Sequence, residues 1–184
     1  MIMRSEMDKT QRLVTTALMM SLVMLGTIVF RIPVPMTQGY VNLGDAMVFI
    51  AVMLLGKKYG TAAAGLGSAL ADVLGGYAMW APWTLVIKAG MAFVTAVIIE
   101  HGRVSGNGNE NNDGKVEIKR PVQPALIAAM ISGSIIMCSG YFIAEWIMYG
   151  NPGAAALGIP WNIGQASAGM IIALLVRRAM PRLR

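Results

Sequence analysis

The sequence predicts an all-α integral membrane protein with six transmembrane helices and both termini on the cytoplasmic side. Of its 184 residues, 56% are hydrophobic and only 13% are charged, whereas soluble domains carry about 25% charged residues. Long apolar segments recur along the chain, and basic residues flank them. The net charge of +6 therefore belongs to the ends of membrane segments rather than to a basic domain, and nucleic acid is not expected as a partner.

The apolar segments set the number of helices. They fall at about residues 12–30, 43–56, 59–75, 82–100, 123–148 and 160–179. A helix crosses the hydrocarbon with about 20 residues, a length that the second and third segments do not reach. Only Gly56, Lys57 and Lys58 separate these two, so they form either one re-entrant pair or two spans joined by a tight turn. We favour two spans, because two adjacent lysines indicate a water interface.

The distribution of positive charge orients the bundle. With the N-terminus inside, all but two of the fifteen basic residues lie on the cytoplasmic side; Arg31 is external and Lys88 lies within the membrane. The opposite orientation would reverse this bias, which normally marks the cytoplasmic side. We expect one membrane domain over residues 1–184, with a flexible cytoplasmic loop at 102–120 that is rich in Gly and Asn.

Four ionisable residues interrupt the apolar segments, and the predicted topology places all of them in the outer half of the membrane. They are Asp45, Asp72, Lys88 and Glu145. Charge in hydrocarbon is expensive, so such residues usually face a cavity or a partner and are functional candidates. Their shared position predicts a solute-binding site that opens to the outside.

The partners of these four residues remain open from sequence alone. Asp72 and Lys88 lie on consecutive antiparallel helices, so they form either a buried pair or ligand contacts. Glu145 has no obvious local cation, which leaves a ligand, Lys88 or Arg31 as its partner. Asp45 follows a glycine, and we expect it to cap the second helix.

Aromatic residues concentrate in the predicted outer loops. Tyr77, Trp83 and Trp161 belong to these loops, and no tryptophan lies at the inner face. An interfacial aromatic belt normally has two sides. The asymmetry indicates that some of these rings line a pocket and stack on a ring-shaped ligand.

Absent motifs narrow the function. The sequence has no P-loop, no zinc-binding cluster and no charged residues through the inner half of the bundle, so we expect no enzyme activity, cofactor or metal, and no self-contained ion path. The alternatives are a self-sufficient small membrane transporter or channel, and a membrane enzyme acting on lipid substrates. Ala17 and Ser21 form a small-residue pair on the first helix, which either packs internally or docks another membrane protein.

Three runs of residues resemble a known family. They are Tyr40-Val-Asn-Leu-Gly-Asp45, Gly65-Leu-Gly-Ser-Ala-Leu-Ala-Asp72 and Ala81-Pro-Trp-Thr84-Leu-Val-Ile-Lys88. They resemble the substrate-binding S components of energy-coupling factor (ECF) vitamin transporters, and within them the group for hydroxymethylpyrimidine, pyridoxine or riboflavin. The motif match covers about residues 40–90, and the remainder matches in topology.

The resemblance implies a subunit of an ECF-type ABC importer in the prokaryotic plasma membrane. It would capture a vitamin or precursor from outside and associate with a membrane-embedded coupling (T) protein and two ATP-binding-cassette ATPases. The expected ligand is first a hydroxymethylpyrimidine or pyridoxine-like ring and second riboflavin, delivered by ATPase-driven reorientation of the subunit. In that family a pair of small residues on the first helix contacts the coupling protein, which corresponds to Ala17 and Ser21 here, with serine replacing the second alanine.

The residues and the resemblance together give a predicted site. The predicted substrate-binding residues are Lys88, Glu145, Tyr141, Asn162, Thr84, Trp83, Tyr77, Trp161 and Asn42. Asp45 and Asp72 are predicted to be structural polar residues. Lys88 and Glu145 are expected to supply charge-assisted hydrogen bonds to the ligand.

Overall fold

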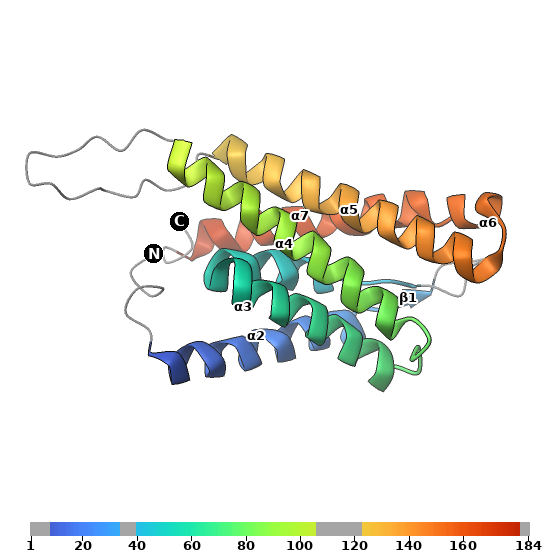
Figure 1. Cartoon of the computed structure of the whole chain (residues 1–184), viewed down its shortest axis with the longest axis horizontal. Helices are drawn as coiled ribbons and strands as arrows, with labels where there is room; N and C mark the ends of the chain where they lie inside the picture. Colours follow the sequence, from blue (N-terminus) through green and yellow to red (C-terminus); the bar gives the residue numbers. More distant parts are fainter. Residues whose placement is uncertain (1–7, 34–39, 106–122, 181–184) are drawn as a thin grey trace, which may run out of the picture.

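A computed structural model describes residues 8–33, 40–105 and 123–180, and they are mainly helical. The elements are α2 (Lys9–Val29), β1 (Ile32–Pro33), β2 (Tyr40–Val41), α3 (Gly44–Leu74), α4 (Ala81–Ser105), α5 (Gln123–Tyr149), α6 (Pro152–Ala156) and α7 (Ile159–Ala179). The predicted loop 102–120 lies mostly outside the described residues. Figure 1 shows the start of α2 and the end of α7 at one end of the bundle, and α6 with the start of α4 at the other.

Five stretches in the described part of the chain are long and apolar enough to cross a membrane. They are Lys9–Val29, Gly44–Leu74, Ala81–Gly102, Pro124–Tyr149 and Pro152–Ala179. The difference from the six predicted spans lies in α3, which contains both the second and the third apolar segments. The count of six spans and the inside position of both termini therefore stay predictions.

Helix α3 is broken where the sequence indicated a turn. Gly56 has φ 70° and ψ −165°, a conformation that side chains with a Cβ rarely adopt. A Cβ on Gly60 would lie only 2.9 Å from the Cα of Val52, although eight residues of a straight helix extend over about 12 Å. The chain therefore folds back on itself, and Figure 1 shows the two arms meeting near the end where α2 begins. The first arm is roughly 18 Å long at 1.5 Å per residue, shorter than the hydrocarbon.

Small residues allow the second arm of α3 to pack closely against its neighbours. A Cβ on Gly67 would lie 2.6 Å from the backbone oxygen of Met20 in α2, and one on Gly65 would lie 3.1 Å from the backbone oxygen of Leu85 in α4. Such contacts bring helix backbones together, which is how helices associate in the absence of water. This arm is thus held between α2 and α4, and its last turn reaches the same end of the bundle as the first turn of α4.

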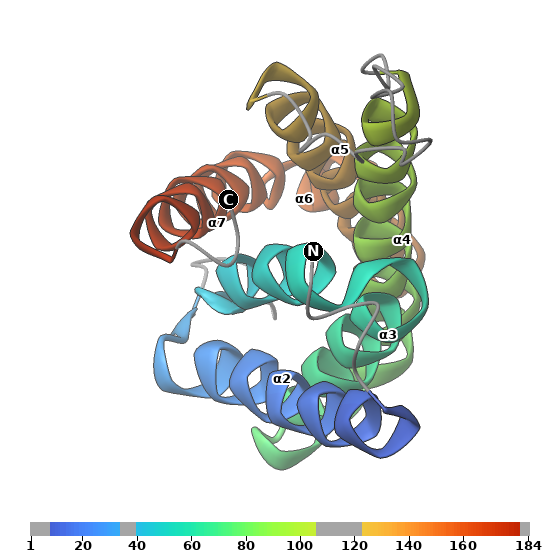
Figure 2. The same ribbon diagram turned by 90° about the vertical axis from the view of Figure 1, so that its left-hand side faces the viewer.

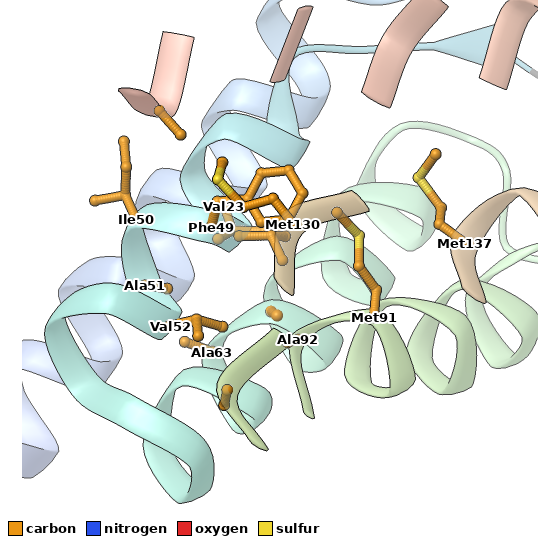
Figure 3. Packing of buried hydrophobic residues seen from close by; sticks show 14 of the residues in the cluster. Val23, Phe49, Ile50, Ala51, Val52, Ala63, Met91, Ala92, Met130 and Met137 are labelled. Carbon is orange, nitrogen blue, oxygen red and sulfur yellow. The ribbon is translucent and has the colours of Figure 1, made fainter. Parts of the chain in front are cut away.

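The apolar core lies between the helices. Figure 3 shows Phe49 of α3, Met91 of α4 and Met130 of α5 within one cluster, and all three are fully buried. Methionine is flexible enough to fill irregular gaps between helices. This core holds the polar residues of one end of the bundle in fixed positions.

The expectation of a purely helical chain was wrong in one detail. β1 and β2 form a short antiparallel ribbon, with Ile32 opposite Val41 and Pro33 opposite Tyr40. Strands of two residues are too short to give an alternating pattern in the sequence. The ribbon matters because it fixes the position of Tyr40.

A short turn leads from α5 into α7. Gly150 has φ 66°, and the Asn151 side chain accepts hydrogen bonds from the backbone nitrogens of Gly153 (2.8 Å) and Ala154 (3.3 Å). Pro152 then starts α6, as is common for the first residue of a helix. The turn brings Gly158 back over the end of α5. Viewed from the end of the bundle, α7 lies beside α5 and the first arm of α3 (Figure 2).

Candidate functional site

A pocket lies at the end of the bundle that contains α6. It is lined by Tyr40, Asn42, Asp72, Trp80, Thr84, Tyr141, Glu145, Gly158, Trp161, Asn162 and Gln165. Its empty volume is about 460 Å³, which includes space open to solvent. The lining comes from β2, the end of α3, the start of α4, the end of α5 and the start of α7. The pocket therefore exists only when all these elements are packed.

Glu145 contributes an unsatisfied carboxylate to this pocket. Its side chain is 5% exposed, and Oε2 is buried with no hydrogen-bond partner among the described residues. The carboxylate lies against Gly158, where an added Cβ would come within 2.5 Å of Oε2. A buried acceptor without a partner costs about 1–3 kcal/mol, and more when it is charged. Such a group is normally retained because something binds it.

Asp72 contributes a second carboxylate. Its Oδ1 accepts a hydrogen bond from the Tyr40 hydroxyl, whereas Oδ2 is buried with no hydrogen bond in the described part of the chain. Burial raises the pKa of Tyr40, and the neighbouring Asp72 carboxylate raises it further. The hydroxyl therefore stays protonated and remains the donor. Asp72, predicted to be structural, also lines the pocket.

Arg31 holds the outer wall of the pocket in place. Its guanidinium donates to the backbone oxygens of Gly75 (2.9 Å) and Ala71 (3.3 Å) at the C-terminus of α3. A cation at this end of a helix is favourable. The same group lies 4.3 Å from the centre of the Tyr40 ring and 4.9 Å from that of Tyr77. The Arg31 guanidinium therefore interacts with the end of α3 and with these two rings, and Arg31 is not among the residues that line the pocket.

Lys88 lies in a separate polar cluster beside the pocket. Its ammonium forms an ion pair with Asp45, and the two side chains are 2% and 0% exposed. The Lys88 Nζ also lies 3.1 Å from the sulfur of Met137 and 5.4 Å from the centre of the Tyr141 ring. Gln165 completes the cluster, because its Nε2 donates to Asp45 Oδ2 at 2.8 Å.

For this cluster the structure differs from one alternative that the sequence left open, an Asp72–Lys88 pair, and from the expectation that Asp45 caps its helix. Lys88 pairs with Asp45 rather than with Asp72, because the fold-back of α3 places its first arm against α4 as well. Asp45 does not cap α3: the N-cap residue is Leu43, with no side-chain hydrogen bond, and the Asn42 side chain accepts from the Gly44 nitrogen instead. Asp45 points inward from the first turn, where its structural role is to hold Lys88.

The structure gathers most of the predicted substrate-binding residues around the pocket. Those that line it are Glu145, Tyr141, Asn162, Thr84, Trp161 and Asn42. Lys88, Tyr77 and Trp83 are not among the lining residues. Tyr77 instead packs edge-on against Tyr40, with ring centres 4.8 Å apart, and so supports the wall from behind.

Sequence reasoning missed several lining residues. They are Tyr40, Trp80, Gly158 and Gln165, and Trp80 is the most informative. Its side chain is 4% exposed, its Nε1 is buried without a hydrogen-bond partner among the described residues, and its ring lies 6.3 Å from that of Tyr141. Trp80 and Trp83 belong to the same turn, and no feature of the sequence distinguishes the directions of their side chains.

The small-residue pair of α2 lies on the outer surface. Ala17 and Ser21 are both exposed, and the Ser21 hydroxyl donates to the Ala17 backbone oxygen at 3.0 Å. The buried face of α2 is formed instead by Thr16, Met19, Val23 and Thr27. The pair is therefore available to lipid or to another membrane protein rather than packed inside this chain.

Comparisons with known proteins agree with this architecture. A solved S component of a bacterial ECF transporter superposes with a TM-score of 0.65 at 17% identity, covering 94% of this chain and 96% of that one, and so shares the fold. A Pyrococcus woesei protein described as "uncharacterized protein in gap 3′region" is 35% identical over 146 residues, 79% of this chain and 85% of the relative. The thiamine precursor transporter HmpT of Lactococcus lactis is 23% identical over 154 residues, 83% of this chain and 77% of the relative.

The family model for the "ECF-type riboflavin transporter, S component" matches residues 7–182, almost the whole chain. This match confirms the family expected from the motifs at residues 40–90. It also accounts for the apolar helices, which mark a multi-pass protein of the cell membrane. The chain belongs to the ECF-type riboflavin transporter S component family and is therefore the substrate-binding membrane subunit of a vitamin transporter.

Proposed function

We propose that this subunit captures a small polar heteroaromatic vitamin or vitamin precursor from outside the cell. The observation that supports this most directly is a set of three buried atoms that have no hydrogen-bond partner among the described residues: Asp72 Oδ2, Trp80 Nε1 and Glu145 Oε2. All three residues line one pocket that also contains aromatic rings. A bound ligand would satisfy these atoms and remove the cost of leaving them unpaired.

The outward direction of the pocket follows from charge. Lys57, Arg177 and Arg178 belong to the fold-back of α3 and the end of α7, which lie at the opposite end of the bundle from the pocket. Among the described residues, Arg31 and the buried Lys88 are the basic residues near the pocket end, and Lys88 is paired with Asp45. Because positive charge accumulates on the cytoplasmic side, the pocket end is proposed to face outward, with both termini inside.

The substrate is proposed to be first a hydroxymethylpyrimidine or pyridoxine-like compound and second riboflavin. The Lactococcus lactis relative is named as a thiamine precursor transporter, which supports the first choice. The matching family model is named for riboflavin, which supports the second. In this proposal Trp80 and Trp161 contact the ring, while Glu145 and Asp72 accept its hydrogen bonds. Lys88, Trp83 and Tyr77 were predicted to contact the substrate directly, and because they do not line the pocket we propose that they act on binding through the residues that do.

Delivery is proposed to require a coupling T protein and two ATP-binding-cassette ATPases. ECF S components work with such modules, and the exposed Ala17 and Ser21 offer a pair of small residues on α2 for contact with the coupling protein. ATPase-driven reorientation of the loaded subunit would then release the substrate inside.

The test begins with the purified protein. Mass spectrometry of released small molecules and a binding panel of vitamins should identify one tight ligand, and a chain that binds no member of the panel would contradict the proposal. Reconstituted vesicles then separate the two transport hypotheses. Uptake only in the presence of the coupling protein and ATPases supports delivery by an ECF module, whereas uptake by the chain alone would favour the self-sufficient transporter.

A further inference from the structure

Gln165 lines the pocket, yet its hydrogen bonds are made within the protein. Its Nε2 donates to Asp45 Oδ2 at 2.8 Å and lies 3.7 Å from the sulfur of Met137. Its Oε1 accepts from the Asn42 backbone nitrogen at 2.8 Å. The side chain thus joins α7 to the first arm of α3 and to the residue that follows β2. Because both ends of the amide are engaged, Gln165 is better suited to hold the pocket wall than to bind a ligand.

The direction of this amide is set by its two neighbours. An ionised carboxylate only accepts hydrogen bonds and a backbone N–H only donates, so the NH2 group of Gln165 must face Asp45 and its oxygen must face Asn42. Asp45 in turn is held by the Lys88 ammonium, which pairs with the other carboxylate oxygen. A directed chain of contacts therefore runs from the ion pair through the Gln165 amide to the backbone of Asn42.

Close packing leaves this chain of contacts little room to shift. A Cβ on Gly169 would lie 2.8 Å from the Cβ of Asp45 and 3.1 Å from the backbone nitrogen of Ala46. The backbone of α7 therefore touches the first arm of α3 at the level of Asp45. Since Gly169 follows Gln165 by about one helical turn, the Gln165 side chain starts from a fixed position beside the carboxylate.

Asn42 carries the effect of these contacts into the pocket. Asn42 lines the pocket together with Gln165, whereas Asp45 and Lys88 are not among the lining residues. The Asn42 Oδ1 accepts from the Gly44 nitrogen at 2.8 Å, so the group that Asn42 can offer to a ligand is its NH2. The position of this donor thus depends on an ion pair that does not itself line the pocket.

We propose that Gln165 is a positioning residue, through which the ion pair of Lys88 and Asp45 fixes the pocket wall and controls ligand affinity without contacting the ligand. The wall in question is Asn42. The inference rests on the proposed function and names residues that shape its site. It differs from a purely structural role of the ion pair, in which ligand affinity returns whenever stability returns. It also differs from direct recognition of the ligand by Gln165.

An exchange of the carboxylate and the amide tests the inference. Purified protein is titrated calorimetrically with hydroxymethylpyrimidine, pyridoxine and riboflavin, and the compound that binds the wild-type protein most tightly is used for all variants. Gln165→Glu places two carboxylates face to face and removes the donor, so affinity should fall at least about 10-fold.

The double variant Asp45→Asn with Gln165→Glu should recover the lost affinity. It again pairs an amide donor with a carboxylate, and the carboxylate at position 165 can still accept from the Asn42 nitrogen. Because the two positions are coupled, the affinity should return to within about threefold of the wild-type value.

A second double variant separates positioning from stability. Asp45→Leu with Lys88→Met removes the ion pair without leaving a buried charge, and denaturant unfolding should show most of the wild-type stability. The Gln165 amide then has no carboxylate to set its direction, so affinity should stay at least about 10-fold below the wild-type value. This variant decides the question even if Gln165→Glu does not fold.

The matched control removes another ion pair between α3 and α4. Lys57 lies 3.9 Å from Glu100 at the opposite end of the bundle from the pocket. Lys57→Met with Glu100→Leu should therefore leave ligand affinity unchanged. An equal loss of affinity in this control would show that the effect does not pass through Gln165, and would overturn the inference.

The other outcomes separate this inference from the proposed function. If Asp45→Asn with Gln165→Glu binds as poorly as Gln165→Glu alone, Gln165 contacts the ligand itself and the inference is wrong. Full affinity in Gln165→Glu, or in the variant without Lys88 and Asp45, would also overturn it. Each of these results preserves a vitamin-binding subunit. A wild-type protein that binds none of the three compounds would overturn the proposed function and the inference with it.

Discussion

The two clusters of buried charge in this bundle differ in how well they are satisfied. Asp45 has Lys88 on one oxygen and Gln165 on the other. Glu145 and Asp72 are buried almost as deeply, yet each retains an oxygen without a hydrogen bond in the described part of the chain. Burial alone therefore does not identify a ligand-binding carboxylate in a membrane protein. The difference lies in whether the protein supplies the partner.

The largest effect on stability is expected when the ion pair between Lys88 and Asp45 is broken. Lys88→Met leaves Asp45 as an uncompensated charge with 0% exposure, so we expect the free energy of unfolding to fall by about 3–5 kcal/mol. Denaturant unfolding in detergent measures this change. The double variant Asp45→Leu with Lys88→Met should recover most of the loss, and a double variant as unstable as the single one would show that the pair is not the cause.

A change to Glu145, which belongs to the pair of carboxylates with an unpaired oxygen, should affect ligand binding instead. Glu145→Ala removes a charge-assisted acceptor, so ligand affinity should fall by at least about 1.5 kcal/mol. Stability without ligand should stay the same or increase, because a buried acceptor without a partner is removed. Calorimetry and thermal unfolding measure the two quantities. A large loss of stability with unchanged ligand affinity would show that Glu145, like Asp45, has a structural role and does not bind the ligand.

Gly158 contacts the Glu145 carboxylate, and a substitution there should change ligand affinity by a smaller amount. Gly158→Ala puts a methyl group 2.5 Å from Glu145 Oε2, which forces the carboxylate to move. We expect a loss of affinity of about 1 kcal/mol, the scale of a displaced hydrogen bond. Gly164→Ala is the matched control, because a Cβ there meets nothing within 4 Å. Equal affinities in the two variants would exclude a role for the position of Glu145.

The smallest effect on binding is expected at the outer face of α2. Ala17→Trp adds bulk to an exposed small residue far from the pocket, so ligand affinity should be unchanged while uptake with the complete transport module is lost. Leu22→Trp, on a different exposed part of the same helix, should retain uptake. Uptake assays in vesicles and calorimetry on the same preparations measure both effects. A loss of affinity in Ala17→Trp would mean that this face supports the pocket.

Features that depend on local composition and spacing can be predicted without any knowledge of the fold. The membrane class follows from hydropathy, and the turn at Gly56 follows from a glycine and two lysines between apolar segments. The placement of Glu145 with Tyr141 on one side of a helix follows from their spacing of four residues. These properties need no knowledge of which helices touch.

Which polar groups meet depends on how the helices pack against one another. Lys88 pairs with Asp45 instead of Asp72 because the folded α3 presents both carboxylates to α4, and a sequence does not reveal the rotation of each arm. For the same reason Trp80 rather than Trp83 lines the pocket, and Gly158 lies over Glu145. Helical periodicity fixes the face on which a residue lies, whereas the packing of several helices at once fixes what that face contacts.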